Sequence, residues 1–414
     1  MPKLHYKRDS CRLCGGGTLK MALSLTPSPP ANAFVKESEL EKEQPLYPLD
    51  LYFCEECKHL QLLDVVDPSL LFENYVYVSG TSQSFVDHFK RYIDSVIGKY
   101  PIPENSLVVD IGSNDGTMLS FFKNYGFSVL GIDPARDIAH KATQSGIETW
   151  NSFFSPDLAQ DIIRQKGLAH IVTANNVFAH VDDMLGFVQG VKQMLHADGV
   201  FVFEVSYLLD VLQKTLFDTI YHEHLAYHSV KPLLSFMQLA GLMVIDVERT
   251  TPHGGSLRVT VQHRAGPYKQ EQSVIDAVIN EEKVGLDKLT TFLAYGSQIQ
   301  AIKERLQELL QTLKQQGKRI AGYGAPAKAT TLMYHFGLGS EHIDFIIDDS
   351  PLKQGLYSPG LHIPVLQPEA IEHESPDYLL ILAWNFAPQI MEKQHSFHKH
   401  GGRFIIPIPK VCII

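Results

Sequence analysis

Apolar and polar residues along the middle of the chain follow a pattern typical of strands that alternate with helices. An apolar run from Leu107 to Ile111 leads into a glycine turn at residues 112–116, and the amphipathic segment TMLSFFKNYG follows. Three further apolar runs are SVLGIDP (128–134), HIVTANN (170–176) and GVFVFEV (199–205). Short apolar runs separated by helical segments indicate a doubly wound, mostly parallel sheet. We therefore expect an α/β fold with a Rossmann-like domain in the middle of the chain.

The last third of the chain predicts a helical bridge and a second domain of the same kind. Apolar residues recur at helical spacing within 281–316, which predicts one long helix: Ile299, Ile302, Leu306, Leu309, Leu310 and Leu313. A strand–turn–helix unit follows at 318–338, and its turn at 322–327 fits the pattern GxGxxA. Further strands are expected at 344–350 and 378–385. These elements predict a smaller, C-terminal Rossmann-like domain.

Composition and charge narrow the class of protein. The chain has 414 residues, enough for two or three domains, and a net charge of −10. This acidic balance argues against nucleic acid as the partner, because phosphate backbones attract basic surfaces. No apolar run reaches the about 18 residues of a membrane span, and the first residues lack the apolar core of a signal peptide. We expect a cytoplasmic protein with no membrane partner.

Four of the five cysteines form two CxxC pairs, Cys11 with Cys14 and Cys54 with Cys57. Each pair can form a tight turn that presents two thiolates to one ion, and four thiolates suit tetrahedral zinc. Disulfides or unrelated thiols are the alternatives, and disulfides are rare in the cytoplasm. No histidine or carboxylate near these cysteines indicates an open coordination position on the metal. The sequence therefore predicts a structural zinc ion. Cys412 is interpreted as a packed, unpaired thiol.

The glycine turn after residue 111 predicts a nucleotide site. Such a turn lets a ligand approach the backbone closely, and a carboxylate at the end of the next strand, Asp133, can accept hydrogen bonds from ribose hydroxyls. NAD enzymes share this arrangement, but their GxGxxG pattern is absent from the turn at 112–116.

Residues 218–230, DTIYHEHLAYHSV, hold three histidines and allow three interpretations. His224 and His228 are spaced to share a metal ion on one helix face, although the HExxH pattern fails. The segment could instead be a structural one with hydrogen-bonded histidines. The third interpretation is acid–base chemistry, because the reference pKa of histidine, about 6.5, lies near neutral pH.

A resemblance that spans nearly the whole chain favours the third interpretation. The chain resembles the sugar C-methyltransferases, which use S-adenosylmethionine (SAM) to methylate a carbon of nucleotide-linked 4-keto deoxysugars. The similar motifs occur in order as CRLCG, CEECKHLQL, ENYVYVSGTS, VVDIGSNDG, NNVFAHV, YHEHLAYHS, HGGSLRV and GYGAPAKATTL. The resemblance implies a zinc-binding domain at 1–75, a SAM-binding catalytic domain at 76–270, and a helical bridge with a sugar-nucleotide-binding domain at 271–414.

The resemblance also implies roles for single residues. His224 matches the general base, and its matching neighbours in the active site are Tyr221, Glu223, His180 and Tyr75. The SAM contacts are expected at Asp110, Gly112, Ser113, Asn114, Asp115, Asp133, Pro134, Asn151 and Asn175. Substrate contacts are expected at Tyr77, Ser79, His228, Arg258, Gly324, Lys328 and Asn385. Arg258 could equally form an ion pair within a strand, and the C-terminal turn could serve only to complete the cleft.

The expected chemistry follows from the acidity of a carbon beside a ketone. A base removes hydrogen next to the C4 ketone, and the enolate carbon then attacks the SAM methyl group. C3 is the expected position and C5 the alternative, on a dTDP- or GDP-linked 4-keto-6-deoxysugar. Two other classes stay open: an NAD-dependent nucleotide-sugar oxidoreductase or epimerase built on the C-terminal turn, and a nonenzymatic zinc-ribbon binding protein.

Overall fold

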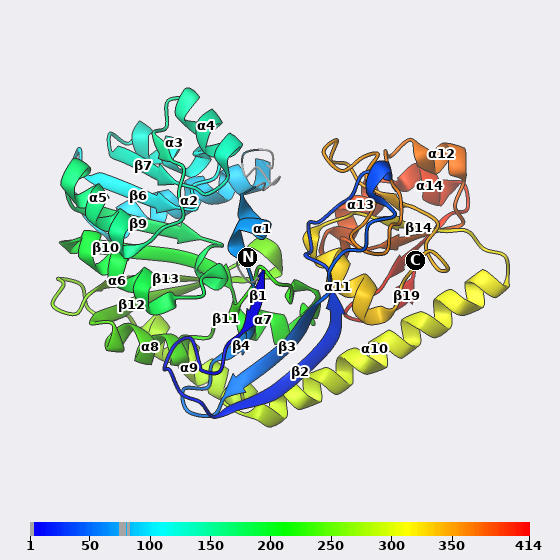
Figure 1. Ribbon diagram of the computed structural model, residues 1–414, viewed down its shortest axis with the longest axis horizontal. Coiled ribbons are helices and arrows are strands. Elements are labelled where there is room, and N and C mark those ends of the chain that lie inside the picture. The colour runs from blue at the N-terminus through cyan, green and yellow to red at the C-terminus, as the bar shows by residue number, and fades with distance from the viewer. Residues whose placement is uncertain (1–3, 74–79, 81–82) are drawn as a thin grey trace.

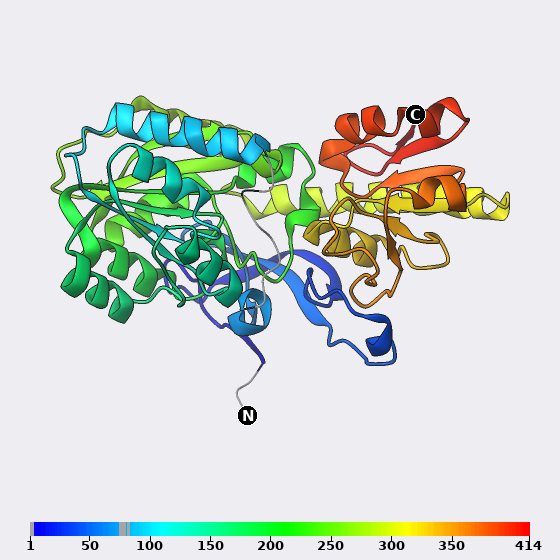
Figure 2. The same ribbon diagram turned by 90° about the horizontal axis from the view of Figure 1, so that it is seen from above.

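The structure is a computed structural model that describes residues 4–73, 80 and 83–414. A large α/β domain and a smaller one lie side by side, and a long N-terminal hairpin and helix α10 (Leu289–Gln315) run beneath both (Figure 1). The view from above places the hairpin at the junction of the two domains (Figure 2). Among the helices of the described residues, none combines the length and apolar character needed to cross a membrane.

The large domain is built on a seven-stranded sheet of order β12-β13-β10-β9-β6-β7-β8. Its strands are β6 (Leu107–Ile111), β7 (Ser128–Ile132), β8 (Thr149–Trp150), β9 (Ala169–Asn175), β10 (Leu195–Ser206), β12 (Leu242–Thr250) and β13 (Ser256–His263). Strands β10, β9, β6, β7 and β8 pair in parallel, and β13 is antiparallel to both of its neighbours. The four predicted strands are therefore present, and the strand order reverses between β6 and β9, where such sheets bind ligands.

The helices of this domain follow the strands as the sequence pattern predicts. They are α2 (Gln83–Lys99), α3 (Thr117–Asn124), α4 (Arg136–Gln144), α5 (Pro156–Lys166), α6 (Met184–Met194), α7 (Leu208–Gln213) and α8 (Val230–Leu239). Short 3₁₀ turns η3 (Phe178–His180), η4 (Phe217–Thr219) and η5 (Pro252–Gly254) connect several of them. Strand β6 is buried along its whole length, as expected for a central parallel strand with both faces covered.

The N-terminal region forms two small sheets. One pairs β1 (His5–Lys7) with β5 (Asp64–Val66), and the other has the order β11-β4-β3-β2. Its members are β2 (Leu19–Ser28), β3 (Tyr47–Cys54), β4 (Leu60–Leu62) and β11 (Ala226–Tyr227), and the region also contains η1 (Glu37–Glu39) and α1 (Pro68–Phe72). Strand β11 belongs to the histidine-rich segment. The zinc-binding region is thus completed by a strand from far along the chain.

Two helices replace the single predicted helix at 281–316. Helix α9 (Gln272–Val284) ends at Gly285, which adopts a left-handed conformation with φ +81° and terminates the helix. Helix α10 then runs from Leu289 to Gln315 and buries the apolar positions that the spacing predicted, among them Ile299, Leu306 and Leu313. It packs against β2 and against α11 (Ala327–Phe336), so it bridges the domains as expected.

The C-terminal domain has a six-stranded sheet of order β16-β15-β14-β17-β18-β19. Its strands are β14 (Ile320–Tyr323), β15 (Ile346–Ile347), β16 (Val365–Leu366), β17 (Tyr378–Ile381), β18 (Arg403–Ile406) and β19 (Cys412–Ile413). Its other elements are α12 (Ala370–Glu374), η6 (Trp384–Phe386), α13 (Ala387–Lys393) and α14 (His395–Lys399). The strand predicted at 378–385 ends at Ile381, and residues 384–386 form η6 instead.

The three parts share one hydrophobic core. A single cluster of buried side chains runs from Leu51 in the N-terminal region through Phe203 in the large domain to Leu332 in the small one. Two separate clusters lie elsewhere in the fold, one around Phe122 and one around Phe404. Because the main cluster is continuous, burial of apolar surface favours one fixed arrangement of the three parts.

Candidate active site

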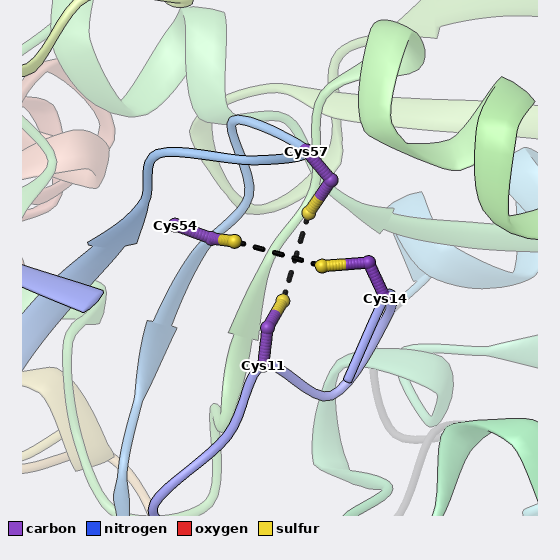
Figure 3. Close-up of side chains that lie close together, drawn as sticks. All are labelled: Cys11, Cys14, Cys54 and Cys57. Atoms are coloured by element: carbon purple, nitrogen blue, oxygen red, sulfur yellow. Dashed lines mark hydrogen bonds between the residues drawn. The ribbon is translucent and has the colours of Figure 1, made fainter. Parts of the chain in front are cut away.

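The four predicted thiols converge (Figure 3). Their sulfur atoms all lie within 4.8 Å of one another, and the Cys11–Cys57 and Cys14–Cys54 pairs are each separated by 3.6 Å. A tetrahedral zinc ion with Zn–S bonds of about 2.3 Å requires sulfur atoms about 3.8 Å apart. The four cysteines form no disulfide. The donor set therefore fits a structural zinc ion held by all four.

The two CxxC turns have the same backbone design. In each, the first cysteine accepts a hydrogen bond from the residue four positions on, Gly15 in one turn and Lys58 in the other. Both of these residues have left-handed backbone conformations, with φ +72° and +70°. This shared turn brings the two thiols of each pair onto one side of the chain.

The glycine loop after β6 lies at the carboxyl ends of β6, β7 and β9, the edge at which sheets of this kind bind their ligands. Gly112 begins the loop after β6 with φ +73°, and a side chain there would place its Cβ only 2.2 Å from Cγ2 of Val177. The amides of Gly112 and Ser113 both donate to the carbonyl of Ile132. Glycine is therefore required, because the loop lies directly against the segment that follows β9.

Two buried carboxylates lie at the ends of the first two strands. Asp110 accepts a hydrogen bond from Oγ1 of Thr173 at 2.6 Å, and burial raises its pKa to about 7. Asp133 accepts from the amides of Asn114 and Ala135 at 2.9 and 2.8 Å, which fixes its orientation, and burial raises its pKa as well. Both groups can accept hydrogen bonds or pair with a cationic ligand.

The remaining predicted cofactor residues divide into two groups. Oγ of Ser113 and Oδ1 of Asn175 are buried atoms without a hydrogen-bond partner among the described residues, so a ligand could satisfy them. Asp115 instead supports the loop by accepting from the amides of Gly80 and Thr117. Asn151 donates to the carbonyls of Asp133 and Pro134, which ties the end of β7 to the end of β8.

The burial of Asp110 leads to a prediction on pH. SAM carries an ammonium and a sulfonium charge, so we expect binding to favour the ionised carboxylate and affinity to rise as pH approaches 7. Because the folded-state pKa is raised, the ligand-free protein should lose stability over the same interval, from about pH 4 to 7. Titration calorimetry at pH 5.5 and 6.8, where an α-amino group such as that of SAM stays mostly protonated, should show affinity rising roughly tenfold.

An Asp110→Asn variant provides the control for this experiment. It keeps the shape of the side chain and the contact with Thr173, but it removes the titrating group. We expect weaker SAM binding with little pH dependence in this interval. An unchanged pH dependence would show that another group controls it.

Four rings, those of Phe72, His180, His224 and Tyr221, pack in a row. Phe72 at the end of α1 stacks on His180 at 5.3 Å between ring centroids, His180 stacks on His224 at 5.1 Å, and Tyr221 lies 4.1 Å from His224. The structure thus brings together three predicted catalytic residues. It also connects them with the cofactor loop, because the amide of His180 donates to the carbonyl of Val177, the residue that contacts Gly112.

One hydrogen bond defines the chemistry of His224. Its Nδ1 lies 2.7 Å from the carbonyl oxygen of Thr219, and because a carbonyl only accepts, Nδ1 must carry the proton. In the neutral ring the basic lone pair is then on Nε2. Burial and the neighbouring His224 hold the pKa of His180 well below its usual value, so His180 stays neutral beside it. Nε2 is therefore the basic nitrogen of the neutral His224 ring.

The side chains of Glu223 and His228, which belong to the same motif, point into the protein interior. The carboxylate of Glu223 accepts from Nδ2 of Asn32 at 2.8 Å, and burial raises its pKa to about 7. His228 is fully buried between Phe178 and His59, with ring centroids 5.2 and 5.6 Å away. The structure therefore places His228 in the core, which removes the basis for a direct substrate contact. The shared-metal interpretation also fails geometrically, because residues 220–229 form no helix.

The structure supports the interpretation that Arg258 forms ion pairs within the sheet. Its guanidinium contacts Glu204 at 3.1 Å and Glu248 at 2.9 Å, lies over the ring of Tyr92 at 4.1 Å, and is nearly completely buried. Glu204 also contacts His88 at 2.8 Å. The partners of Arg258 are thus inside the sheet, and the predicted substrate contact is not supported by its position.

The C-terminal turn contacts the histidine-rich segment. Nζ of Lys328 lies 3.7 Å from Asp218 and 4.5 Å from the ring centroid of Trp384, and Nε1 of Trp384 donates to Asp218 at 2.6 Å. Next to this cluster, Oδ1 of Asn385 is buried without a partner among the described residues. Asp218 was not predicted as a site residue. Its position four residues before the first histidine of the motif was the only sequence signal.

Local hydrogen bonds hold the glycine turn of the small domain. Asp348, at the position that would bind ribose, accepts from the amides of Ala325 and Ser350, and Lys353 donates to the carbonyl of Ala325. Gly324 has φ +87°, and a Cβ there would lie 2.5 Å from that of Ala383. Asp133 accepts two backbone amides in the same way in the large domain, so the turns of the two domains share one design.

Three predicted residues, Tyr75, Tyr77 and Ser79, lie outside the described part of the chain. Two residues that sequence reasoning missed, Arg12 and Asp182, connect the zinc-binding turns to the histidine pair. Arg12 stands between Cys11 and Cys14, and Asp182 comes two residues after His180.

The strand order, the glycine loop and the paired carboxylates define a class I SAM-dependent methyltransferase with an N-terminal zinc-binding region. Comparisons with known families agree with this class. Residues 11–72 match a "zinc binding domain", residues 86–247 a "Methyltransferase domain", and residues 251–409 a "C-methyltransferase C-terminal domain".

A full-length relative identifies the family. The chain is 35% identical over 406 residues to the C-methyltransferase NovU of Streptomyces niveus, and the alignment covers 98% of this chain and 97% of that protein. The chain therefore belongs to the C-methyltransferase family and is a SAM-dependent C-methyltransferase.

Solved structures similar to the large domain include two methyltransferases. A SAM-dependent methyltransferase from Clostridium acetobutylicum is 11% identical, with 44% of this chain and 92% of that chain covered and a TM-score of 0.36. The magnesium protoporphyrin IX methyltransferase of Synechocystis, with bound SAM, is 16% identical, with 44% and 81% covered and a TM-score of 0.32. At such scores these superpositions add nothing to the family assignment.

Proposed function

We propose that this C-methyltransferase methylates C3 of a nucleotide-linked 4-keto-6-deoxysugar through an enolate formed by His224. The observation that supports it best is the continuous segment from Asn175 to His180. That segment contacts the cofactor loop at Val177 and the histidine pair at His180. The proposed base, His224, is thereby connected to the loop proposed to hold the methyl donor, and carbon methylation requires a base near that donor.

The residues divide the chemistry among them. Nε2 of His224 takes the proton from C3, and the electron pair of that C–H bond moves to give a C3–C4 double bond and an oxyanion at C4. SAM, when bound, supplies a methyl group on a positively charged sulfur. Tyr221 is proposed to donate a hydrogen bond to the developing oxyanion, together with Tyr75 and His180 as the resemblance implies. The neutral state of His180 keeps a second positive charge away from His224.

The sugar nucleotide is proposed to bind between the large and small domains, at Gly324, Lys328 and Asn385, with Tyr77 and Ser79. Lys328 already contacts Asp218, so a diphosphate would add to a paired lysine or replace the carboxylate as its partner. Burial lowers the pKa of Lys328, and a phosphate group would favour its charged form.

Mass spectrometry and NMR of the products test this proposal. We expect the purified enzyme, given SAM and dTDP- or GDP-linked 4-keto-6-deoxyhexoses in deuterium oxide, to add one methyl group at C3. A product methylated at C5 would change the assigned position within the same chemistry. If every such keto sugar showed neither methylation nor deuterium exchange, although SAM bound normally, the proposed substrate class would be wrong.

A further inference from the structure

Arg12 joins the zinc-binding turns to both histidines of the proposed active site. It stands between the ligands Cys11 and Cys14, and its side chain has no exposed surface. Its Nε donates to Oδ1 of Asp182 at 3.0 Å. Its Nη1 faces three acceptors: Oε1 of Gln61 at 3.1 Å, the carbonyl of Leu62, and the carbonyl of Leu225 at 3.4 Å. Asp182 follows His180 by two residues, and Leu225 directly follows His224.

Leu225 is where these segments meet. Its carbonyl accepts from the amide of Leu62 at 2.9 Å as well as from Arg12, and its amide donates to the carbonyl of Ala179 at 2.8 Å. Leu62 ends β4, the strand that follows the second pair of zinc ligands and pairs with β11. Both zinc-binding turns therefore hold the backbone beside His224, and Leu225 connects that backbone to the one beside His180.

A guanidinium suits this position better than an ammonium, because Nε and Nη1 donate in different directions. Its planar fork can bind a carboxylate and two carbonyls at once, whereas a lysine ammonium has one nitrogen. Asp182 also accepts from Tyr6 and, at 3.1 Å, from Arg8. Arg8 donates to neither Leu62 nor Leu225 through its side chain, which makes it a natural comparison.

We infer that Arg12 is a positioning residue that sets His224 against His180, so that the zinc-binding region acts as the scaffold of the catalytic base. This inference rests on the proposed role of His224. It gives the zinc-binding region a part in turnover, through geometry, beyond its part in the stability of the N-terminal fold.

The test compares Arg12→Lys with Arg8→Lys. We expect Arg12→Lys to lower kcat about 10- to 100-fold, because a displacement of order 1 Å can cost that much, with the KM for SAM and the zinc content unchanged. Arg8→Lys should cause a much smaller loss. Equal kcat values for Arg12→Lys and the wild type would overturn the inference, and so would equal losses in the two variants.

A second readout does not depend on any substrate. Long-range ¹H–¹⁵N NMR of ¹⁵N-histidine-labelled protein, with His224 assigned by its loss in His224→Asn, reports which ring nitrogen carries the proton. We expect protonated Nδ1 in the wild type and a mixed or altered protonation state in Arg12→Lys, whereas an unchanged state would count against the inference.

If Arg12→Lys fails to fold, Asp182→Asn removes the charge of the carboxylate that Arg12 contacts, and it is expected to change the His180 and His224 signals. If the wild type were inactive on every keto sugar, the proposed substrate class would be wrong. The NMR measurement would still test the role of Arg12, because it needs no substrate.

Discussion

Replacing His224 with asparagine is expected to lower the rate of methyl transfer by about 10²- to 10⁴-fold, the usual contribution of a positioned general base. Asparagine can still donate to the carbonyl of Thr219, which His224 contacts at 2.7 Å, but it offers no basic nitrogen. The measurement is the rate of product formation at saturating SAM. Deuterium exchange at C3 of the sugar should fall in parallel, because the same step removes that hydrogen.

Two comparisons make this result specific. Tyr221→Phe keeps the ring beside His224 but removes the hydroxyl, so we expect a smaller loss that reflects oxyanion stabilisation. SAM affinity should be unchanged in His224→Asn, since the cofactor loop is elsewhere. If His224→Asn retained near-normal turnover, the base would have to be another residue.

Replacing Cys54 with serine is expected to abolish zinc binding and the cooperative folding of the N-terminal region. Cys54 is fully buried at the end of β3, and its sulfur lies 3.6 Å from that of Cys14. Structural zinc sites contribute roughly 10–16 kcal/mol of apparent binding energy, which is larger than the stability of most domains. Metal analysis by mass spectrometry and thermal unfolding monitored by circular dichroism would measure both effects.

Cys412→Ser is the matched control, because Cys412 lies far from the cluster in sequence and is exposed on the edge strand β19, which corrects the prediction that it is packed. It should retain one zinc ion and the unfolding temperature of the wild type. If Cys54→Ser is insoluble, gradual removal of zinc from the wild type by a chelator gives the same information. A chelated protein that kept its unfolding temperature would show that the four thiols do not need the metal.

The sequence alone determined the elements that depend on local patterns. Short apolar runs between helical segments predicted the parallel strands, because a strand buried on both faces must be apolar throughout. The CxxC pairs predicted the thiol cluster, because each turn is built from neighbouring residues. The sequence also predicted that the glycine turn at 112 and the carboxylates at 110 and 133 lie close together, because parallel strands place their carboxyl ends at one edge of the sheet.

Only the tertiary structure decided which partner each polar side chain meets. Arg258 was equally suited to a phosphate or a carboxylate, and the neighbouring strand supplied Glu204. His228 lies in the same motif as His224, yet a strand from the N-terminal region covers it. The role of Arg12 depends on carbonyl groups 50 and 213 positions away along the chain. Such contacts depend on which backbone lies opposite, and that is fixed by the shared hydrophobic core and not by local sequence.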